Sequence, residues 1–219
     1  MKKYLSVLKQ CPLFAGIEAE NIPAMLGCIG GRVYEYGKNE TIFMEGDPAT
    51  QVGVVLSGAV QIIREDFYGK RSIMGSVHPG QLFGESFACA EIERMPVSVI
   101  ATEKSEIMRI DCRRITMSCS NACAFHSRMI LNLLGVVAAK NLMLNQKIEI
   151  MSQRSTKEKL MTYLLDQAKR HKSSEFTIPF DRQSLADYLG VERSALSAEI
   201  SKLRGEGILE TNRSYFKLL

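Results

Sequence analysis

The chain is poor in histidine, and this shortage excludes one class of enzyme. Its 219 residues contain only three histidines, His78, His126 and His171, which are 48 and 45 residues apart. A metal-dependent enzyme on a β-barrel needs two or three histidines and a carboxylate that converge on one ion, so no metal site is predicted. The chain also lacks a Gly-rich phosphate loop and a Ser/His/Asp arrangement typical of nucleophilic catalysis. We therefore predict a protein that is not an enzyme.

Long uncharged apolar runs are absent too, as are internal repeats and low-complexity tracts. A membrane-spanning helix needs roughly 18 or more such residues, so the sequence predicts no membrane span. The N-terminal "MKKYLSVLKQCPLF" is basic, but Lys9 and Gln10 interrupt its apolar residues, so it does not predict a signal peptide. The six cysteines are scattered through a chain that is large enough to fold without disulfides. Reduced thiols and a cytoplasmic location are the expectation.

The net charge of +4 is modest but unevenly distributed. From Ser152 to the C-terminus, twelve Lys and Arg face nine Asp and Glu, so this segment carries +3 of the total. Such a balance permits nucleic-acid binding without proving it.

The first half of the chain predicts β-structure. Between residues 31 and 111, short apolar stretches such as "TIFME", "VGVVLSG" and "PVSVIAT" alternate with Gly, Pro and Asp turns. This pattern is typical of an antiparallel barrel or jelly roll. A helical leader, "ENIPAMLGCI", precedes it. With the helical segments that follow, the predicted fold class is α+β.

The middle of the chain changes to a helical period. Apolar positions spaced by four and three residues form a three-heptad seam, with one Asn that can fix register in a dimer. The seam consists of Ile130, Leu134, Val137, Asn141, Leu144, Ile148 and Met151. The alternative is an amphipathic helix that packs on its own domain. Because Met129, Leu133, Val136, Leu142 and Met143 make other sides apolar as well, we expect one face to serve the barrel and the seam to serve a partner chain.

The last segment predicts a winged helix-turn-helix. A basic-ended helix, "TKEKLMTYLLDQAKRHK", precedes the short strand "FTIPF". Asp181 is placed to cap the next helix, and Gly190 ends it. A second helix, "RSALSAEISKLRGEG", leads into "ILETNRSYFKLL", which is interpreted as two strands around a turn. The predicted domains are a sensory barrel over residues 1–116, a dimerisation helix over 117–151 and a DNA-binding domain over 152–219.

The second of these paired helices is predicted to enter the major groove of DNA. Its first turns carry polar side chains of little bulk, so its axis can lie deep between the phosphates. A plain helical hairpin would use the same apolar pattern. The candidate DNA-binding residues are Arg182, Gln183, Glu192, Arg193, Ser194, Ser197, Lys202 and Arg213.

Three stretches resemble one family across almost the full length. They are "GKNETIFMEGDPATQVGVVLSGAVQI", "HPGQLFGE" and "RQSLADYLGVERSALSAEISKLRGEGIL". In these stretches the chain resembles the cyclic AMP receptor protein/FNR (Crp/Fnr) family of bacterial transcription regulators. The resemblance implies a homodimer with an effector-sensing barrel and two winged domains that read a palindromic operator in double-stranded DNA and touch RNA polymerase. Ala198 stands where well-known members carry a base-reading arginine, and Ser194 where many carry Glu, which predicts a different operator.

The resemblance also defines what a cyclic AMP pocket would require. Gly84 and Glu85 match the family's phosphate and ribose contacts, but Arg94 is followed by Met95 and Pro96 instead of a Ser or Thr donor. Between Ser127 and Ser152 no Ser or Thr can reach the base. We therefore expect an effector other than cyclic AMP, or none. The candidate pocket residues are Phe83, Gly84, Glu85, Phe87, Arg94, Met143 and Leu144.

A redox- or gas-responsive regulator of the same family is the alternative. FNR-type members place three closely spaced cysteines near the N-terminus, whereas this chain has only Cys11 and Cys28 there, which argues against an iron–sulfur cluster. Cys112, Cys119 and Cys123 lie closer together and leave a two-thiol redox pair open. His78 and His126 are isolated, which argues against haem. The sequence leaves the effector unidentified.

Overall fold

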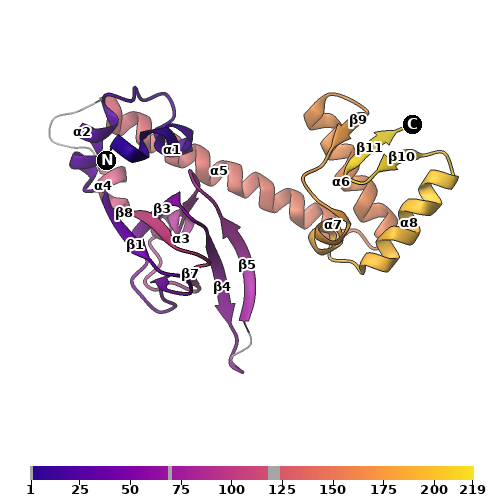
Figure 1. The fold of residues 1–219 in the computed structure, drawn as a ribbon, viewed down its shortest axis with the longest axis horizontal. Helices are drawn as coiled ribbons and strands as arrows, with labels where there is room; N and C mark the ends of the chain where they lie inside the picture. Colours follow the sequence, from indigo (N-terminus) through magenta and orange to yellow (C-terminus); the bar gives the residue numbers. More distant parts are fainter. Residues whose placement is uncertain (1, 69–70, 118–123) are drawn as a thin grey trace. The chain divides into compact units, whose positions relative to one another are not determined.

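The computed structural model describes residues 2–68, 71–117 and 124–219. The chain divides into two compact units, residues 1–139 and residues 140–219. Helix α5 (Ala124–Ser152) runs from the first unit into the second, as Figure 1 shows. The boundary between the units therefore lies inside the helix that the sequence treats as a separate dimerisation segment. The three predicted domains, with boundaries after residues 116 and 151, stay a prediction.

The first unit begins with a helical leader that is longer than expected. It comprises η1 (Lys2–Tyr4), α1 (Leu5–Gln10), η2 (Pro12–Phe14) and α2 (Ile22–Ile29). Only α2 was predicted from the sequence. It ends at Gly30, whose backbone takes the left-handed conformation with φ 66°, as helix ends commonly do.

Two four-stranded antiparallel sheets form the barrel. One has the strand order β1-β8-β3-β6 and the other β2-β7-β4-β5. Their bounds are β1 (Arg32–Tyr36), β2 (Thr41–Phe43), β3 (Gln51–Ser57), β4 (Val60–Glu65), β5 (Arg71–Val77), β6 (Leu82–Phe83), β7 (Ser98–Ala101) and β8 (Ser105–Asp111). Short helices α3 (Glu85–Cys89) and α4 (Cys112–Thr116) follow β6 and β8. The predicted jelly roll is confirmed.

Strand β3 packs against core residues on both of its faces. Val55 faces the other sheet and shares a core with Phe43 and Phe83, while Val52 and Val54 face the N-terminal helices. Because the strand is buried on both faces, its sequence "QVGVVLS" is a continuous apolar run rather than an alternation.

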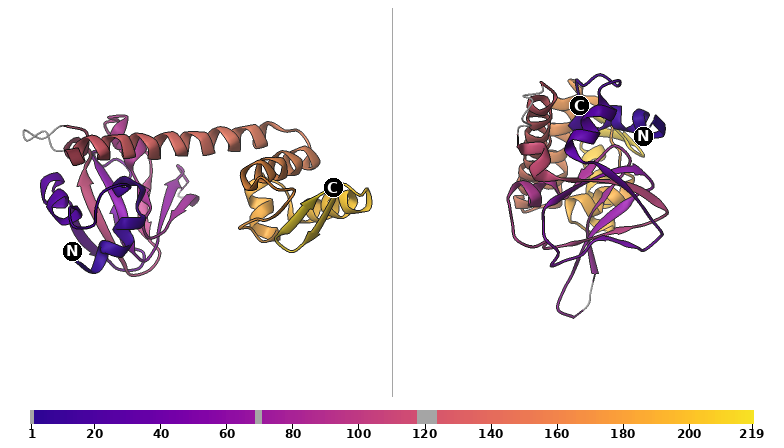
Figure 2. Two further views of the ribbon diagram at one scale, coloured as in Figure 1. Left: turned by 90° about the horizontal axis from the view of Figure 1, so that it is seen from above. Right: turned by 90° about the vertical axis from the view of Figure 1, so that its left-hand side faces the viewer.

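The first turns of α5 run along the barrel of the first unit (Figure 2). Met129 and Leu133 are buried in one core cluster with residues of the N-terminal helices, and Val136 packs against this cluster. The prediction that a second apolar side of the helix packs against the barrel unit is confirmed for these three residues.

The seam of α5 remains exposed in the single chain. Leu134, Leu144 and Ile148 are 63%, 61% and 65% exposed, although Ile130 and Val137 are half-buried. Phe125–Ser152 is also long and apolar enough to cross a membrane, because it contains an 18-residue window with a mean hydropathy of 1.3. The sequence expectation did not foresee this, because it required an uncharged run. A helix that pairs with a second copy satisfies the same criteria of length and composition.

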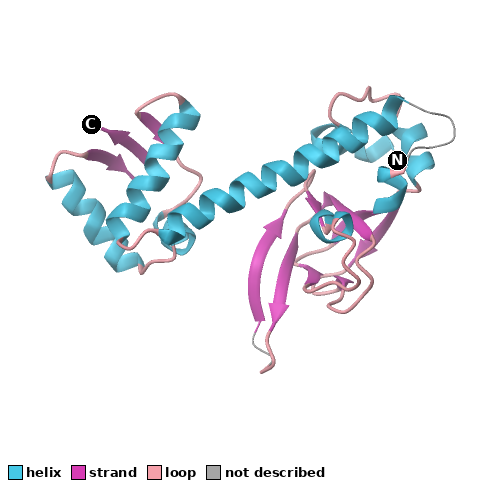
Figure 3. Ribbon diagram, turned by 180° about the vertical axis from the view of Figure 1, so that it is seen from behind, coloured by secondary structure: helices cyan, strands magenta, loops and turns pink. Residues whose placement is uncertain are grey.

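The second unit is a small helical domain with a three-stranded sheet (Figure 3). It contains α6 (Thr156–His171), β9 (Glu175–Thr177), α7 (Arg182–Leu189), α8 (Arg193–Gly205), β10 (Leu209–Asn212) and β11 (Tyr215–Leu218). The strands pair in the order β10-β11-β9. Leu185, Leu196, Ile200 and Phe216 are buried together in its core. The predicted winged helix-turn-helix is confirmed.

Local capping fixes where these helices begin. Ser155 and Glu158 form a capping box at the start of α6, in which each side chain binds the other residue's backbone N–H. Asp181 accepts a hydrogen bond from the backbone N–H of Ser184 at 2.7 Å, as its predicted role as N-cap requires. Gly190 ends α7 with φ 61°, and Glu192 then precedes the first turn of α8.

Candidate functional site

Helix α8 presents a polar face because its other face is committed to the core. Leu196, Ile200 and Leu203 are buried, which turns Arg193 and Ser194 toward solvent at the first turn and leaves Ser197 half-buried one turn later. Helix residues three and four apart share a face, so this division follows directly from the spacing of the apolar residues.

A concave basic surface lies between α7, α8 and the turn of the β-hairpin. It has a volume of about 620 Å³ and is lined by Asp181, Arg182, Gln183, Arg193, Arg213 and Ser214. Four of the predicted DNA-binding residues therefore come together: Arg182, Gln183, Arg193 and Arg213. They come from three elements that the sequence separates by up to about 30 positions. Three arginines against one aspartate make the surface positive, which suits the phosphate backbone.

The arginines of this surface are held in place. Arg182 stacks over the ring of Phe216, with its guanidinium carbon 5.6 Å from the ring centroid. Burial lowers the pKa of Arg182 from its ordinary value. Arg213 occupies the hairpin turn with φ 53°, a left-handed conformation that is uncommon outside glycine. Gln183 donates a hydrogen bond to Asp187 at 2.9 Å, so its amide is oriented along the outside of α7.

Lys202 is not brought to this surface. It follows Arg193 by nine positions, which at 3.6 residues per turn places it about 180° around the helix. Its ammonium lies 3.9 Å from Glu206, which also pairs with Lys157 at 3.3 Å. Glu192 precedes α8 as its N-cap, and Ser194 and Ser197 lie on the first turns of this helix; none of the three lines the concave basic surface. The DNA contacts of all eight predicted residues stay predictions.

The predicted effector residues of the barrel are mostly engaged in the fold. Phe83 has no exposed surface, and its ring packs 5.4 Å from that of Phe43. Gly84 has φ 80°, and Glu85 is only 1% exposed. Phe87 packs partly buried against the same core. Phe83 therefore acts as a core residue here.

Arg94 is exposed and bound to the protein itself. Its Nη1 donates to the carbonyl oxygen of Gly46 at 2.9 Å, and its Nε lies 3.9 Å from Glu93. Met143 and Leu144 belong to the second unit, and both are exposed. The grouping of these seven residues into one pocket stays a prediction.

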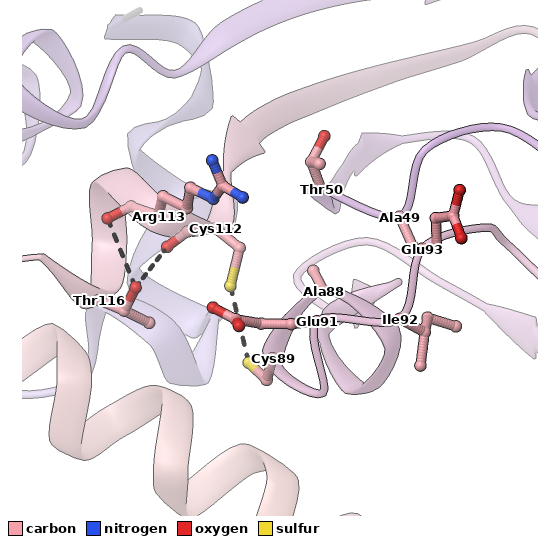
Figure 4. Close-up of a pocket in the computed structure, with 10 residues that line it drawn as sticks. All are labelled: Ala49, Thr50, Ala88, Cys89, Glu91, Ile92, Glu93, Cys112, Arg113 and Thr116. Atoms are coloured by element: carbon pink, nitrogen blue, oxygen red, sulfur yellow. Dashed lines mark hydrogen bonds between the residues drawn. The ribbon is translucent and has the colours of Figure 1, made fainter.

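A different hollow opens beside α3 and α4 (Figure 4). It has a volume of about 470 Å³ and is lined by residues that include Ala88, Cys89, Ile92, Cys112 and Thr116. The sulfurs of Cys89 and Cys112 face each other at 3.7 Å. The sequence does not predict this contact, because the two cysteines are 23 positions apart. Cys89 ends α3 and Cys112 begins α4, and these two helices meet only in the folded barrel.

Neither of these cysteines forms a disulfide in the structure, and burial disfavours ionisation of their thiols. Burial, followed by the neighbouring Cys89, raises the pKa of the Cys112 thiol to about 12. Burial also raises the pKa of the Cys89 thiol. The other predicted partners of Cys112, namely Cys119 and Cys123, lie outside the described residues. Among the residues that the structure describes, no group of three or more His, Cys, Asp and Glu could hold a metal ion.

Comparison with known proteins agrees with this architecture. Residues 33–119 match the cyclic nucleotide-binding domain, and residues 158–219 match the Crp-like helix-turn-helix domain. A cyclic nucleotide-binding domain followed by a Crp-like helix-turn-helix domain is the arrangement of a DNA-binding transcription regulator. The chain belongs to the Crp/Fnr family of DNA-binding transcription regulators.

Its relatives are distant. The chain is 23% identical over 187 residues to the transcriptional activator protein FnrA of Stutzerimonas stutzeri, covering 83% of this chain and 74% of that protein. It is 33% identical over 103 residues to the cyclic AMP receptor protein of Thermus thermophilus, which is about half of each chain (47% and 46%). The crystal structure of the Thermus thermophilus catabolite activator protein has the same fold, with a TM-score of 0.55, 21% identity and coverage of 95% of this chain and 93% of that one.

Proposed function

We propose that the protein acts in the cytoplasm as a homodimer that reads an inverted repeat in double-stranded DNA. The observation that carries the proposal is the concave basic surface formed by Arg182, Gln183, Arg193 and Arg213. Each element around it has a distinct task. Helix α8 enters the major groove, α7 braces it across the backbone, and the hairpin turn places Arg213 against an adjacent phosphate.

The exposed seam of α5 supports the dimer. Seven positions repeat with heptad spacing, and three of them are more than 60% exposed in the single chain. Asn141 accepts a hydrogen bond from the side-chain amide of Asn145 at 2.9 Å through its Oδ1, so both N–H donors of its own Nδ2 are available to the partner helix. Burying this seam against a second copy removes an apolar face from water.

The effector of this dimer is a small molecule other than cyclic AMP. Phe83 fills the barrel core, and Arg94 is bound to the carbonyl oxygen of Gly46 and precedes Met95 and Pro96. Effector binding at the barrel shifts the population between arrangements of the two DNA-binding units, so that the α8 helices come to lie one DNA turn apart, about 34 Å. Contact with RNA polymerase is expected from the family resemblance.

Redox control is a second candidate, supported by the distance of 3.7 Å between the sulfurs of Cys89 and Cys112. A peroxide would oxidise the pair to a disulfide. Cys89, the more exposed thiol, would lose its proton to solvent and attack the peroxide oxygen, which gives a sulfenic acid and, with that proton returned, water. The Cys112 thiol would then displace a second water as the S–S bond forms. Because burial raises the pKa of both thiols, the oxidation should be slow at neutral pH and faster at higher pH. The S–S bond would link α3 to α4. Mass spectrometry after peroxide treatment would detect the loss of two hydrogens, with Cys28→Ser as a control that retains the pair.

Selection of genomic fragments tests the leading proposal. The purified, reduced protein is incubated with sheared DNA at near-physiological salt without an added effector. Enrichment of an inverted repeat with half-sites about one helical turn apart is expected. Enrichment of a single unrepeated motif would contradict the dimer. DNA recognition would be contradicted if no fragment bound under any condition, including after addition of peroxide or cell extract.

A further inference from the structure

Three arginines from three separate elements meet at one end of the first sheet of the barrel. Arg32 lies on β1, Arg109 on β8 and Arg114 on α4. They line a hollow of about 220 Å³ that is completed by Gly30, Tyr34, Gln51 and Asp111. Three positive charges against one negative charge leave the lining at +2. We call this the basic hollow.

Two of these arginines stand directly opposite each other. Arg32 and Arg109 are paired across the antiparallel strands β1 and β8, so their side chains leave the same face of the sheet. Like charges at directly opposed positions destabilise a sheet. An anion between them removes the repulsion.

Arg109 is fixed in position by uncharged partners. Its Nε donates to the side-chain oxygen of Gln51 at 2.6 Å, and its Nη1 donates to the Tyr36 hydroxyl at 3.3 Å. The guanidinium carbon lies 5.1 Å from the ring centroid of Tyr34 and 5.2 Å from that of Phe43. Such contacts orient a guanidinium without neutralising it.

The one carboxylate in the lining is engaged elsewhere. Asp111 accepts a hydrogen bond from the backbone N–H of Arg113 at 2.9 Å and so caps α4. Among the residues that the structure describes, no carboxylate oxygen lies within ion-pairing distance of the guanidinium of Arg109. Among the described residues, Nη2 of Arg109 donates to no protein acceptor, since the hydrogen bonds of this guanidinium use Nε and Nη1. Within that part of the chain, the Nη2 donors can therefore serve a ligand.

We propose that the basic hollow binds a phosphate group, either as free phosphate or as part of a small phosphorylated compound. A guanidinium presents paired donors that match two phosphate oxygens, and the further arginines of the same lining add positive charge that favours a dianion. The hollow is smaller than the roughly 300–1,000 Å³ typical of sites for drug-sized ligands, so it suits a phosphate or diphosphate. Its residues differ from Gly84, Glu85 and Arg94, although Arg109 and Gln51 also line a neighbouring hollow together with Phe43 and Met95.

Calorimetric titration of the full chain in phosphate-free buffer tests this site. The probes are inorganic phosphate, pyrophosphate and glycerol phosphate, with chloride as the reference anion. Arg109→Gln and Arg32→Gln should each weaken binding by about tenfold, because each removes one charged donor. Arg64→Gln is the matched control, because Arg64 is an exposed arginine on β4 outside the hollow.

The variants also separate folding from binding. Arg109 packs on two rings, so Arg109→Gln alone could reduce affinity by disturbing the barrel, whereas Arg32 is exposed and leaves the core intact. Tightest binding of inorganic phosphate supports the site with the free ion as ligand, and tightest binding of pyrophosphate or glycerol phosphate supports it with a phosphorylated compound. Absence of binding at about 10 mM of every probe, or equal affinity in Arg32→Gln and Arg64→Gln, would overturn the proposal.

Discussion

The guanidinium of Arg182 and the backbone of Arg213 are joined across the DNA-binding unit. Nη2 of Arg182 donates to the carbonyl oxygen of Arg213 at 3.5 Å, which connects the first turn of α7 to the turn of the hairpin. Through this contact the helix and the wing are presented as one surface. Because both residues also line the concave basic surface, a phosphate bound there would touch both elements at once.

Arg193→Ala should weaken specific DNA binding more than Lys202→Ala. Arg193 lies on the concave basic surface, whereas Lys202 points to the opposite side of α8 and pairs with Glu206. Loss of a base contact costs roughly 1–3 kcal/mol, and loss of a phosphate contact lowers the slope of log K against log salt by about one. Fluorescence anisotropy with a selected operator at several salt concentrations measures both. Equal losses in the two variants would place the reading face elsewhere.

Leu134→Glu with Ile148→Glu should convert the dimer to a monomer. Both residues lie on the exposed seam, and burying two carboxylates in a coiled-coil interface is strongly unfavourable. Ala139→Glu is the control, because Ala139 is exposed on the side of α5 that lies away from the seam. Light scattering after size exclusion reports the mass of each variant. A dimer that persists in the double variant, or is lost equally in the control, would count against this seam.

Gly53→Ala should destabilise the barrel. A Cβ atom built at residue 53 would lie 2.2 Å from Cζ of Phe83, whose ring is fully buried and has little room to move. Overpacking of this kind costs about 1–3 kcal/mol of the free energy of unfolding. Combining Gly53→Ala with Phe83→Leu should recover part of that loss, which chemical denaturation of the four proteins in the cycle measures. Additive losses would show that the two positions do not clash.

Acidification should remove stability that depends on Glu106. Hydrogen bonds from Lys3 at 2.6 Å and from Tyr4 at 2.8 Å lower the pKa of this carboxyl to about 2. The folded-state pKa lies below the unfolded one, so the contribution is complete above the ordinary pKa of about 4.3 and is lost as the pH falls toward 2. Denaturation of Glu106→Gln should therefore depend less on pH between about 2 and 4.5 than that of the wild type. The exposed control Glu20→Gln should keep the wild-type slope, and an unchanged slope in Glu106→Gln would refute the assignment.

Much of this architecture is predictable because local signals agree with it. The caps at Asp181 and Gly190, the period-two and heptad patterns and the hairpin around Arg213 each act within a few residues. The sequence therefore predicts the barrel, the long helix and the winged unit in the right order. The leader was predicted only in part, because α1 is six residues long and has no side-chain cap to mark its start.

The residue contacts that the sequence did not predict join strands that lie far apart along the chain. Cys89 meets Cys112 because β6 and β8 both pair with β3, and Arg32 meets Arg109 through the register of β1 with β8. Periodicity cannot supply such registers. Lys202 was predicted with the other DNA-binding residues, and its position about 180° around α8 from Arg193 separates it from the concave basic surface, so its DNA contact stays a prediction.

The separation between DNA half-sites tests the central account most directly. The affinity of the protein is measured for a selected inverted repeat and for versions in which about five base pairs are added between the half-sites, which turns them to opposite faces of the duplex. If a homodimer reads both half-sites through α8, affinity falls to that of a single half-site and recovers in part when a full turn is added. An affinity that does not change with spacing would contradict the account.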